Sequence, residues 1–137
     1  MARIYLDSNV FISYVKDEIG FNWRALFIET EKFFERVAAG GHVIVLSSLF
    51  LDEVKKITRM NEEGILGTFG KLNIRSEIYP INQVLFTLRF KKLGIHQLDA
   101  IHVAASIESG CTCIVTFNMK DFARQQEIPV FQPATFR

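Results

Sequence analysis

The feature that most constrains the fold is a series of short apolar runs that do not alternate with polar residues. A strand with one wet face alternates, whereas a parallel strand covered on both faces is apolar nearly throughout. The runs are Arg3–Leu6, His42–Leu46, Glu77–Ile81, Thr112–Thr116 and Ile128–Phe131. The last contains Pro129, which suits an edge strand. The sequence therefore predicts a parallel sheet.

Stretches with helical spacing of apolar residues separate these runs. They are Arg24–Ala38, Ser48–Met60, Leu98–Ser109 and Asn118–Gln126. The stretch Asn61–Gly70, with three glycines, is predicted to be the most flexible part and a possible start of a further helix. Strands that alternate with helices predict an α/β fold: a doubly wound parallel sheet flanked by helices. The 137 residues suit one domain, 1–137, and the 13 Phe predict an aromatic-rich core.

The composition also bears on where the protein works. No apolar stretch is long enough for a membrane span or a signal peptide. The only cysteines, Cys111 and Cys113, are predicted to lie on one face of a strand, too close for a disulfide, as reduced, buried side chains. We therefore expect a cytoplasmic protein that does not associate with membranes.

Two acidic residues follow the first two predicted strands. Asp7 comes directly after Arg3–Leu6, where its simplest role is to cap a helix. Glu53 shares a predicted helical stripe with Leu49, Phe50, Val54 and Ile57, so it is expected on the apolar side, whereas Asp52 points away. A buried carboxylate needs a cation, a proton or a partner, and a Lys or Arg is the simplest alternative to a metal.

Two more acidic residues lie near the later strands. Asp99 opens a predicted buried helix, and Asp121 follows Asn118 at the spacing of a capping box. Each has capping as its alternative role. Ligand sites of open α/β sheets form outside the carboxyl ends of the strands, and carboxylates gathered there repel unless a divalent cation joins them. Oxygen ligands favour Mg²⁺ or Mn²⁺. With these acids in a pocket, the 16 Lys and Arg outnumber the remaining acids, which suits a polyanion.

The chain resembles the PIN-domain family in four segments that occur in the family's order. They are IYLDSNV, SSLFLDEV, LDAIHVAAS and VTFNMKDF, around Asp7, Glu53, Asp99 and Asp121. The last two together are the most specific. The resemblance implies a PIN-like fold, Mg²⁺ or Mn²⁺ at these four acids as catalytic and metal-binding residues, and cleavage of single-stranded RNA. It also implies that Ser8, Thr116 and Asn118 line the site.

In length the chain is similar to the VapC toxins of toxin–antitoxin pairs. That similarity implies an antitoxin protein as a possible partner, and a homodimer is a further expectation. The segment Lys16–Trp23 is longer and more polar than a minimal PIN domain requires. Candidate RNA contacts lie near the acids on helices, where charged residues commonly form only a solvated face; they are Lys55, Lys56, Arg59, Arg89, Lys91, Lys92, Lys120 and Arg124.

Two other functions remain open from the sequence. A receiver-like phospho-acceptor domain also binds Mg²⁺ at strand ends, but it needs adjacent acids after the first strand, and here Asp7 is followed by Ser8 and Asn9. A non-catalytic interaction module with the same fold would not need the four acids. His102 lies one turn from Asp99, and a histidine among apolar residues is more often packed and hydrogen-bonded than functional.

Overall fold

A single parallel sheet organises the chain. The computed structural model describes residues 1–16, 24–81, 92–95 and 97–137. Five strands form the sheet in the order β3-β2-β1-β4-β5, and every neighbouring pair is parallel. They are β1 (Arg3–Leu6), β2 (Val43–Ser47), β3 (Arg75–Tyr79), β4 (Cys113–Val115) and β5 (Val130–Phe131). The predicted α/β class and the edge position of β5 are therefore confirmed.

The strand boundaries differ from the prediction where side chains compete with the ladder. β2 begins at Val43 because the His42 ring accepts a hydrogen bond from the Ala2 amide instead. β3 lies two residues earlier than predicted and ends before Pro80, which has no N–H for a ladder. Only β1 has the predicted bounds.

Six helices are seen in the described residues. They are α1 (Ser8–Val15), α2 (Arg24–Gly40), α3 (Ser48–Thr58), α4 (Glu62–Lys71), α6 (Gln97–Glu108) and α7 (Met119–Phe122). The segment predicted as most flexible is mainly helix α4, whose first turn is capped by the Asn61 side chain. α7 is much shorter than predicted, because the Gln125 side chain hydrogen-bonds the backbone at Ile128 and turns the chain toward β5.

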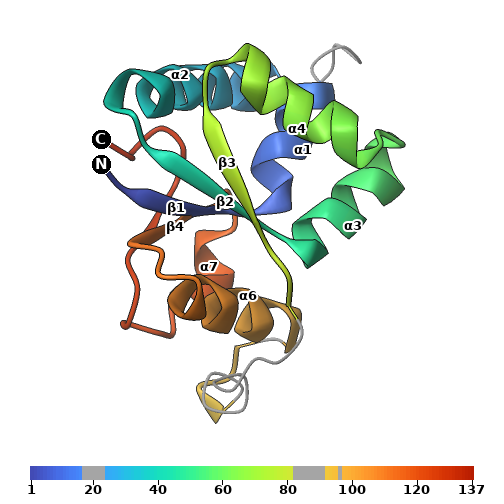
Figure 1. Cartoon of the computed structure of the whole chain (residues 1–137). Helices are drawn as coiled ribbons and strands as arrows, with labels where there is room; N and C mark the ends of the chain where they lie inside the picture. Colours follow the sequence, from blue (N-terminus) through green and yellow to red (C-terminus); the bar gives the residue numbers. More distant parts are fainter. Residues whose placement is uncertain (17–23, 82–91, 96) are drawn as a thin grey trace.

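Helices cover both faces of the sheet (Figure 1). Ile4 and Leu6 of β1 point into a core shared with α1, α2, α3 and α4. Tyr5, between them, points into a second core with α6 and α7. This two-sided burial explains why the strand residues do not alternate in polarity.

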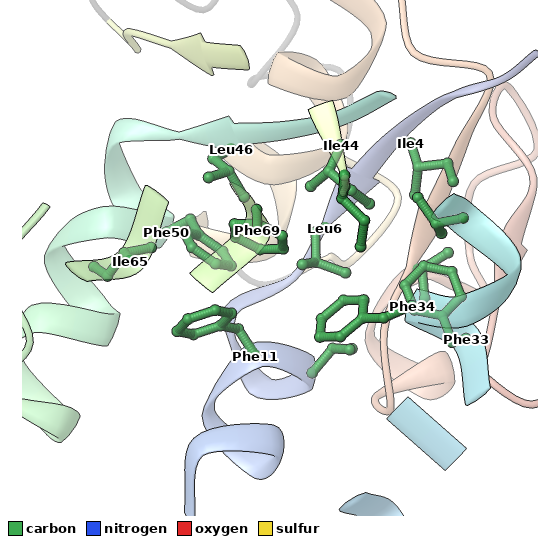
Figure 2. Packing of buried hydrophobic residues seen from close by; sticks show 14 of the residues in the cluster. Ile4, Leu6, Phe11, Phe33, Phe34, Ile44, Leu46, Phe50, Ile65 and Phe69 are labelled. Carbon is green, nitrogen blue, oxygen red and sulfur yellow. The ribbon is translucent and has the colours of Figure 1, made fainter. Parts of the chain in front are cut away.

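The larger core is aromatic, as predicted (Figure 2). Phe11 of α1 packs against Phe50 of α3 and Phe69 of α4, with ring centroids 5.7 and 5.2 Å apart. All three rings are fully buried. This packing fixes the first turns of α1 and α3 against the sheet; Asp7 directly precedes α1, and Glu53 lies one turn further along α3.

The structure bears on two predictions from the composition, which concern membrane spans and the two cysteines. Among the helices of the described segments, none has the length and apolar character needed to cross a membrane. Both cysteines are free thiols, but the prediction that they share a face is wrong. β4 begins only at Cys113, which joins the larger core, whereas Cys111 precedes the strand and packs against the other core.

Candidate functional site

Asp7 lies at the carboxyl end of the central strand β1. Its backbone has the extended geometry of an N-cap for α1, with φ −77° and ψ 144°, but its side chain makes no capping hydrogen bond. One carboxylate oxygen, Oδ2, instead accepts a hydrogen bond of 2.8 Å from the Thr116 hydroxyl, just beyond β4. Capping therefore does not account for this carboxylate, which is turned toward the neighbouring strand.

Thr116 holds the Asp7 carboxylate in place from the β4 side. Its side chain is fully buried, and its hydroxyl donates to Asp7 while it accepts from the Asn9 side-chain amide at 3.3 Å and from the Asn118 N–H at 3.0 Å. The Asn9 side chain in turn accepts from the Phe117 N–H at 3.3 Å. A hydroxyl has one proton and two lone pairs, and all are used here. The loop after β4 is therefore tied to α1 and to Asp7.

Glu53 approaches the same edge of the sheet from α3. Ser47, the last residue of β2, caps this helix by accepting a 3.0 Å hydrogen bond from the Phe50 N–H. Glu53 lies in the second turn, where its Oε2 accepts a 2.7 Å hydrogen bond from the Ser8 hydroxyl. Its Oε1 lies 3.5 Å from His102 Nε2. Because α1 follows β1 and α3 follows the adjacent strand β2, Ser8 on α1 comes into contact with Glu53 on α3.

The predicted stripe on α3 is only partly correct. Phe50 and Val54 are buried as expected, but Leu51 is buried as well and Ile57 is 48% exposed. The buried face is rotated toward Leu51, so the Glu53 side chain lies at its border, 42% exposed. Asp52 is exposed, as predicted.

The two carboxylates influence each other's ionisation. Burial is the largest cause that raises the pKa of Asp7, and the negative charge of Glu53 raises it further, against the opposing effects of His102 and the Thr116 hydrogen bond. The pKa of Glu53 is lowered, chiefly by its hydrogen bond with His102 and also by Ser8, although burial opposes this. Within the described part of the chain, no Lys or Arg contacts either carboxylate.

His102 is the site residue whose role the sequence did not reveal. The expectation of a packed, hydrogen-bonded histidine is confirmed, because the residue is 4% exposed and Nδ1 lies 2.6 Å from the Tyr5 hydroxyl. Its other ring nitrogen, however, faces Glu53. The available signal was the segment LDAIHVAAS, in which His102 follows Asp99 by three residues and so shares its helix face.

The remaining two acids are placed differently. Asp99 lies in the first turn of α6, inside a helix that begins at Gln97, and is partly buried. Asp121 is exposed on α7, and the predicted capping box is absent because the Asn118 side chain makes no capping bond. In residues 1–16, 24–81, 92–95 and 97–137, no three His, Cys, Asp or Glu side chains form a metal-sized group. The structure thus brings Asp7 and Glu53 together without joining all four acids into one such group.

A pocket of about 430 Å³ continues the site beyond the ends of β4 and β5. Asn118, Lys120 and Asp121 line it from one side, and Gln132, which follows β5, lines it from the other. Another pocket, of about 440 Å³, lies by α7 and β5 against Ile128 and Pro129 and contains none of the four acids. Only the first is connected to Asp7, through the Asn118–Thr116 hydrogen bond.

Several predicted RNA contacts can be located. Lys55, Lys56 and Arg59 are exposed at the end of α3, and Lys55 Nζ lies 4.0 Å from a Glu62 carboxylate oxygen. The other exposed cations of this set are Lys92, Lys120 and Arg124. Arg89, Lys91 and residues 17–23 of the Lys16–Trp23 segment lie outside the described residues.

Comparison of the sequence with known family models gave no match, and comparison with curated proteins gave none either.

The Asp7–Glu53 pair has the chemistry of a site for a hard divalent cation. Its donors are carboxylate oxygens, with hydroxyls of Ser8 and Thr116 beside them, and Mg²⁺ and Mn²⁺ prefer such ligands. Two neighbouring carboxylates repel each other, and a bound cation would relieve that repulsion. By their donor chemistry, the carboxylates of Asp7 and Glu53 therefore fit a metal.

Proposed function

We propose that this chain is a PIN-type endoribonuclease that cleaves single-stranded RNA with Mg²⁺ or Mn²⁺. The observation that carries the proposal is the pairing of Asp7 and Glu53 at the carboxyl ends of adjacent central strands, held by hydroxyls and a histidine rather than by Lys or Arg. A carboxylate with a purely structural role would more often cap a helix or pair with Lys or Arg. These two are oriented and close together, as ligands of a shared cation would be.

The order of the strands supports the same function over the receiver-like alternative. From β3 to β5 the order is 3-2-1-4-5, so the direction of winding reverses between β1 and β4. Ligands of open α/β sheets bind at this reversal, and Asp7 and Thr116 meet there. Receiver-type folds have the order 2-1-3-4-5. We therefore describe the fold as doubly wound and PIN-like.

In this proposal Asp7 and Glu53 would hold the cation, and Asp99 and Asp121 would supply further carboxylate oxygens. When bound, the cation would supply activation of a water molecule and neutralisation of charge on the phosphate. Ser8 fixes the carboxylate of Glu53, and Thr116 fixes that of Asp7, so that their remaining lone pairs have defined directions.

The pocket beside the acids indicates how a single strand would lie. Asn118, beyond β4, and Gln132, beyond β5, line it, so the pocket lies on the β4–β5 side of Asp7 along the carboxyl edge. Its side-chain amides can hydrogen-bond an unpaired base, and Lys120 can contact a phosphate. A nucleotide next to the cleaved bond would therefore occupy this pocket.

The direct test is cleavage of a single-stranded RNA with Mg²⁺, Mn²⁺ or EDTA. Asp7→Asn, Glu53→Gln and Asp99→Asn should abolish metal-dependent cleavage while circular dichroism shows a folded protein. The matched control is Asp52→Asn, on the same helix but exposed, which should cleave like wild type. Metal-independent cleavage, or equal loss in Asp52→Asn, would overturn the assignment. A labile aspartyl phosphate after treatment with a small phosphodonor would instead favour a receiver-like domain.

As a toxin, the chain would act with an antitoxin. We propose that such a partner inserts a cation, Arg by preference, toward Asp7 and Glu53, which have none from the described residues. Expression of the chain alone should slow growth, and co-expression of a partner encoded beside it should restore it. Normal growth with active, folded protein would favour a housekeeping nuclease. Light scattering would test the proposed homodimer.

A further inference from the structure

A chain of buried polar contacts leads from the sheet to Glu53. It begins at Tyr5 of β1, whose side chain is fully buried and whose hydroxyl lies 2.6 Å from His102 Nδ1. It continues through the His102 ring on α6, and Nε2 lies 3.5 Å from Glu53 Oε1. Three elements that are distant in the sequence thus meet at one carboxylate. Burying polar groups costs free energy unless each of them finds a partner. An apolar core would avoid this cost, so packing alone does not explain the arrangement.

The contacts determine where the imidazole proton lies. If the Tyr5 hydroxyl donates to Nδ1, the neutral ring carries its proton on Nε2, the nitrogen that lies 3.5 Å from Glu53 Oε1. If the ring is a cation, Nε2 again carries a proton. The remaining tautomer would place a lone pair of Nε2 against the Glu53 carboxylate and is disfavoured. The contacts with Tyr5 and Glu53 together therefore favour the form in which His102 presents an N–H to Glu53.

Glu53 needs such a partner because of its position. It is a long side chain, 42% exposed at the border of α3, and a free glutamate there would sample several rotamers. Ser8 holds one oxygen, Oε2, with a 2.7 Å hydrogen bond, and His102 faces the other. Both oxygens are thus directed by groups that are themselves buried, since Ser8 is 3% exposed.

We propose that His102, oriented by Tyr5, is a positioning residue that fixes Glu53 for binding of the divalent cation. The inference rests on the proposed function, because it assigns a task in the same site. Groups that hydrogen-bond a metal ligand typically change metal affinity 10- to 100-fold when they are removed. His102 acts through Glu53 and is not itself a ligand.

The test measures Mn²⁺ affinity by calorimetry, without RNA, for a set of four variants. His102→Leu, which removes the N–H, should weaken binding by about 10-fold or more. His102→Gln, whose terminal amide can still donate to Glu53, should recover most of the affinity. Tyr5→Phe should weaken binding less than His102→Leu, because it releases the tautomer and leaves the ring. Ser106→Ala, also buried on α6 but bonded only to the Val103 carbonyl, is the control and should match wild type.

A nitrogen-detected spectrum of the imidazole gives a second measurement that packing alone would not alter. Wild type should show the Nε2–H form, and Tyr5→Phe should show a larger share of the other tautomer than wild type. Mn²⁺ binding by His102→Leu or Tyr5→Phe as tight as that of wild type would overturn the inference and leave the proposed function intact. Failure of wild type to bind Mn²⁺ would overturn both. If His102→Leu does not fold, Tyr5→Phe and the tautomer spectrum decide.

Discussion

Replacing the Thr116 hydroxyl by a methyl group should destabilise the protein strongly for so small a change. Thr116→Val keeps the branched shape but leaves three groups without their partner: the Asp7 carboxylate, the Asn9 amide and the Asn118 N–H. A hydrogen bond to a charged group contributes about 1.5–3 kcal/mol, and a neutral one about 0.5–1.5 kcal/mol. Because the two neutral bonds are 3.3 and 3.0 Å long, we take the lower ends of these ranges. The expected loss is about 2.5 kcal/mol in the free energy of unfolding, or roughly 8 °C in Tm.

Urea denaturation followed by circular dichroism, in EDTA at pH 7, measures this loss. The control is Thr116→Ser, which keeps the hydroxyl and removes one buried methyl group, at a cost of about 1 kcal/mol. Thr116→Val should be clearly less stable than Thr116→Ser. The opposite order, or equal stability of Thr116→Val and wild type, would show that the hydroxyl does not organise Asp7 and the loop after β4.

Three further predictions follow from the same residues. Asp7→Asn should raise Tm in EDTA at pH 7. Burial raises the pKa of Asp7, so the stability that this carboxyl contributes when protonated is lost as the pH rises through its folded-state pKa. The difference in Tm between variant and wild type should therefore vanish in acid. Glu53→Gln should lower Tm at pH 7, and the difference should disappear as the pH falls from the ordinary glutamate pKa of 4.5 through the lower folded-state pKa of Glu53, because the stabilisation requires the ionised group; a constant difference at all pH values would contradict this. Gln132→Ala should raise KM for single-stranded RNA several-fold with little change in kcat, whereas the exposed Gln126→Ala should not, and equal KM values would exclude the pocket from RNA binding.

The sheet was the most predictable part of the structure. Non-alternating runs identified parallel strands, and β1 has the predicted bounds. The strand order could not be predicted, since it depends on how each crossover returns to the sheet. That order places Asp7 beside Thr116, although most of the sequence lies between the two residues.

The site was predictable in its residue types and less so in its contacts. Asp7 and Glu53 were found from their places after the first two strands. The spacing of apolar residues on α3 did not reveal that Leu51 faces the core and Ile57 does not, because helix periodicity alone leaves the rotation of the helix uncertain. His102 looked like a core residue from its neighbours, and only the approach of α6 to α3 shows its contact with Glu53.

Capping was the most misleading signal. Asp7 and Asn118 both occupy positions that precede a helix, yet neither side chain makes a capping bond. At Asn118 the backbone has φ −98° and ψ 66°, which is not the extended geometry of an ordinary N-cap. At Asp7 the geometry is correct, but the Thr116 hydroxyl is a competing partner. Tertiary contacts therefore took these polar groups away from their local roles.

The central claim is that Asp7 and Glu53 hold a divalent cation, and a calorimetric titration of Mn²⁺ into RNA-free protein at pH 7 tests it most directly. Wild type should show saturable binding, and Asp7→Asn should lose it while remaining folded, because the amide cannot supply a second anionic oxygen beside Glu53. Asp52→Asn should bind like wild type, since that side chain is exposed on the same helix. Absence of binding by wild type, or unchanged binding by Asp7→Asn, would contradict the account.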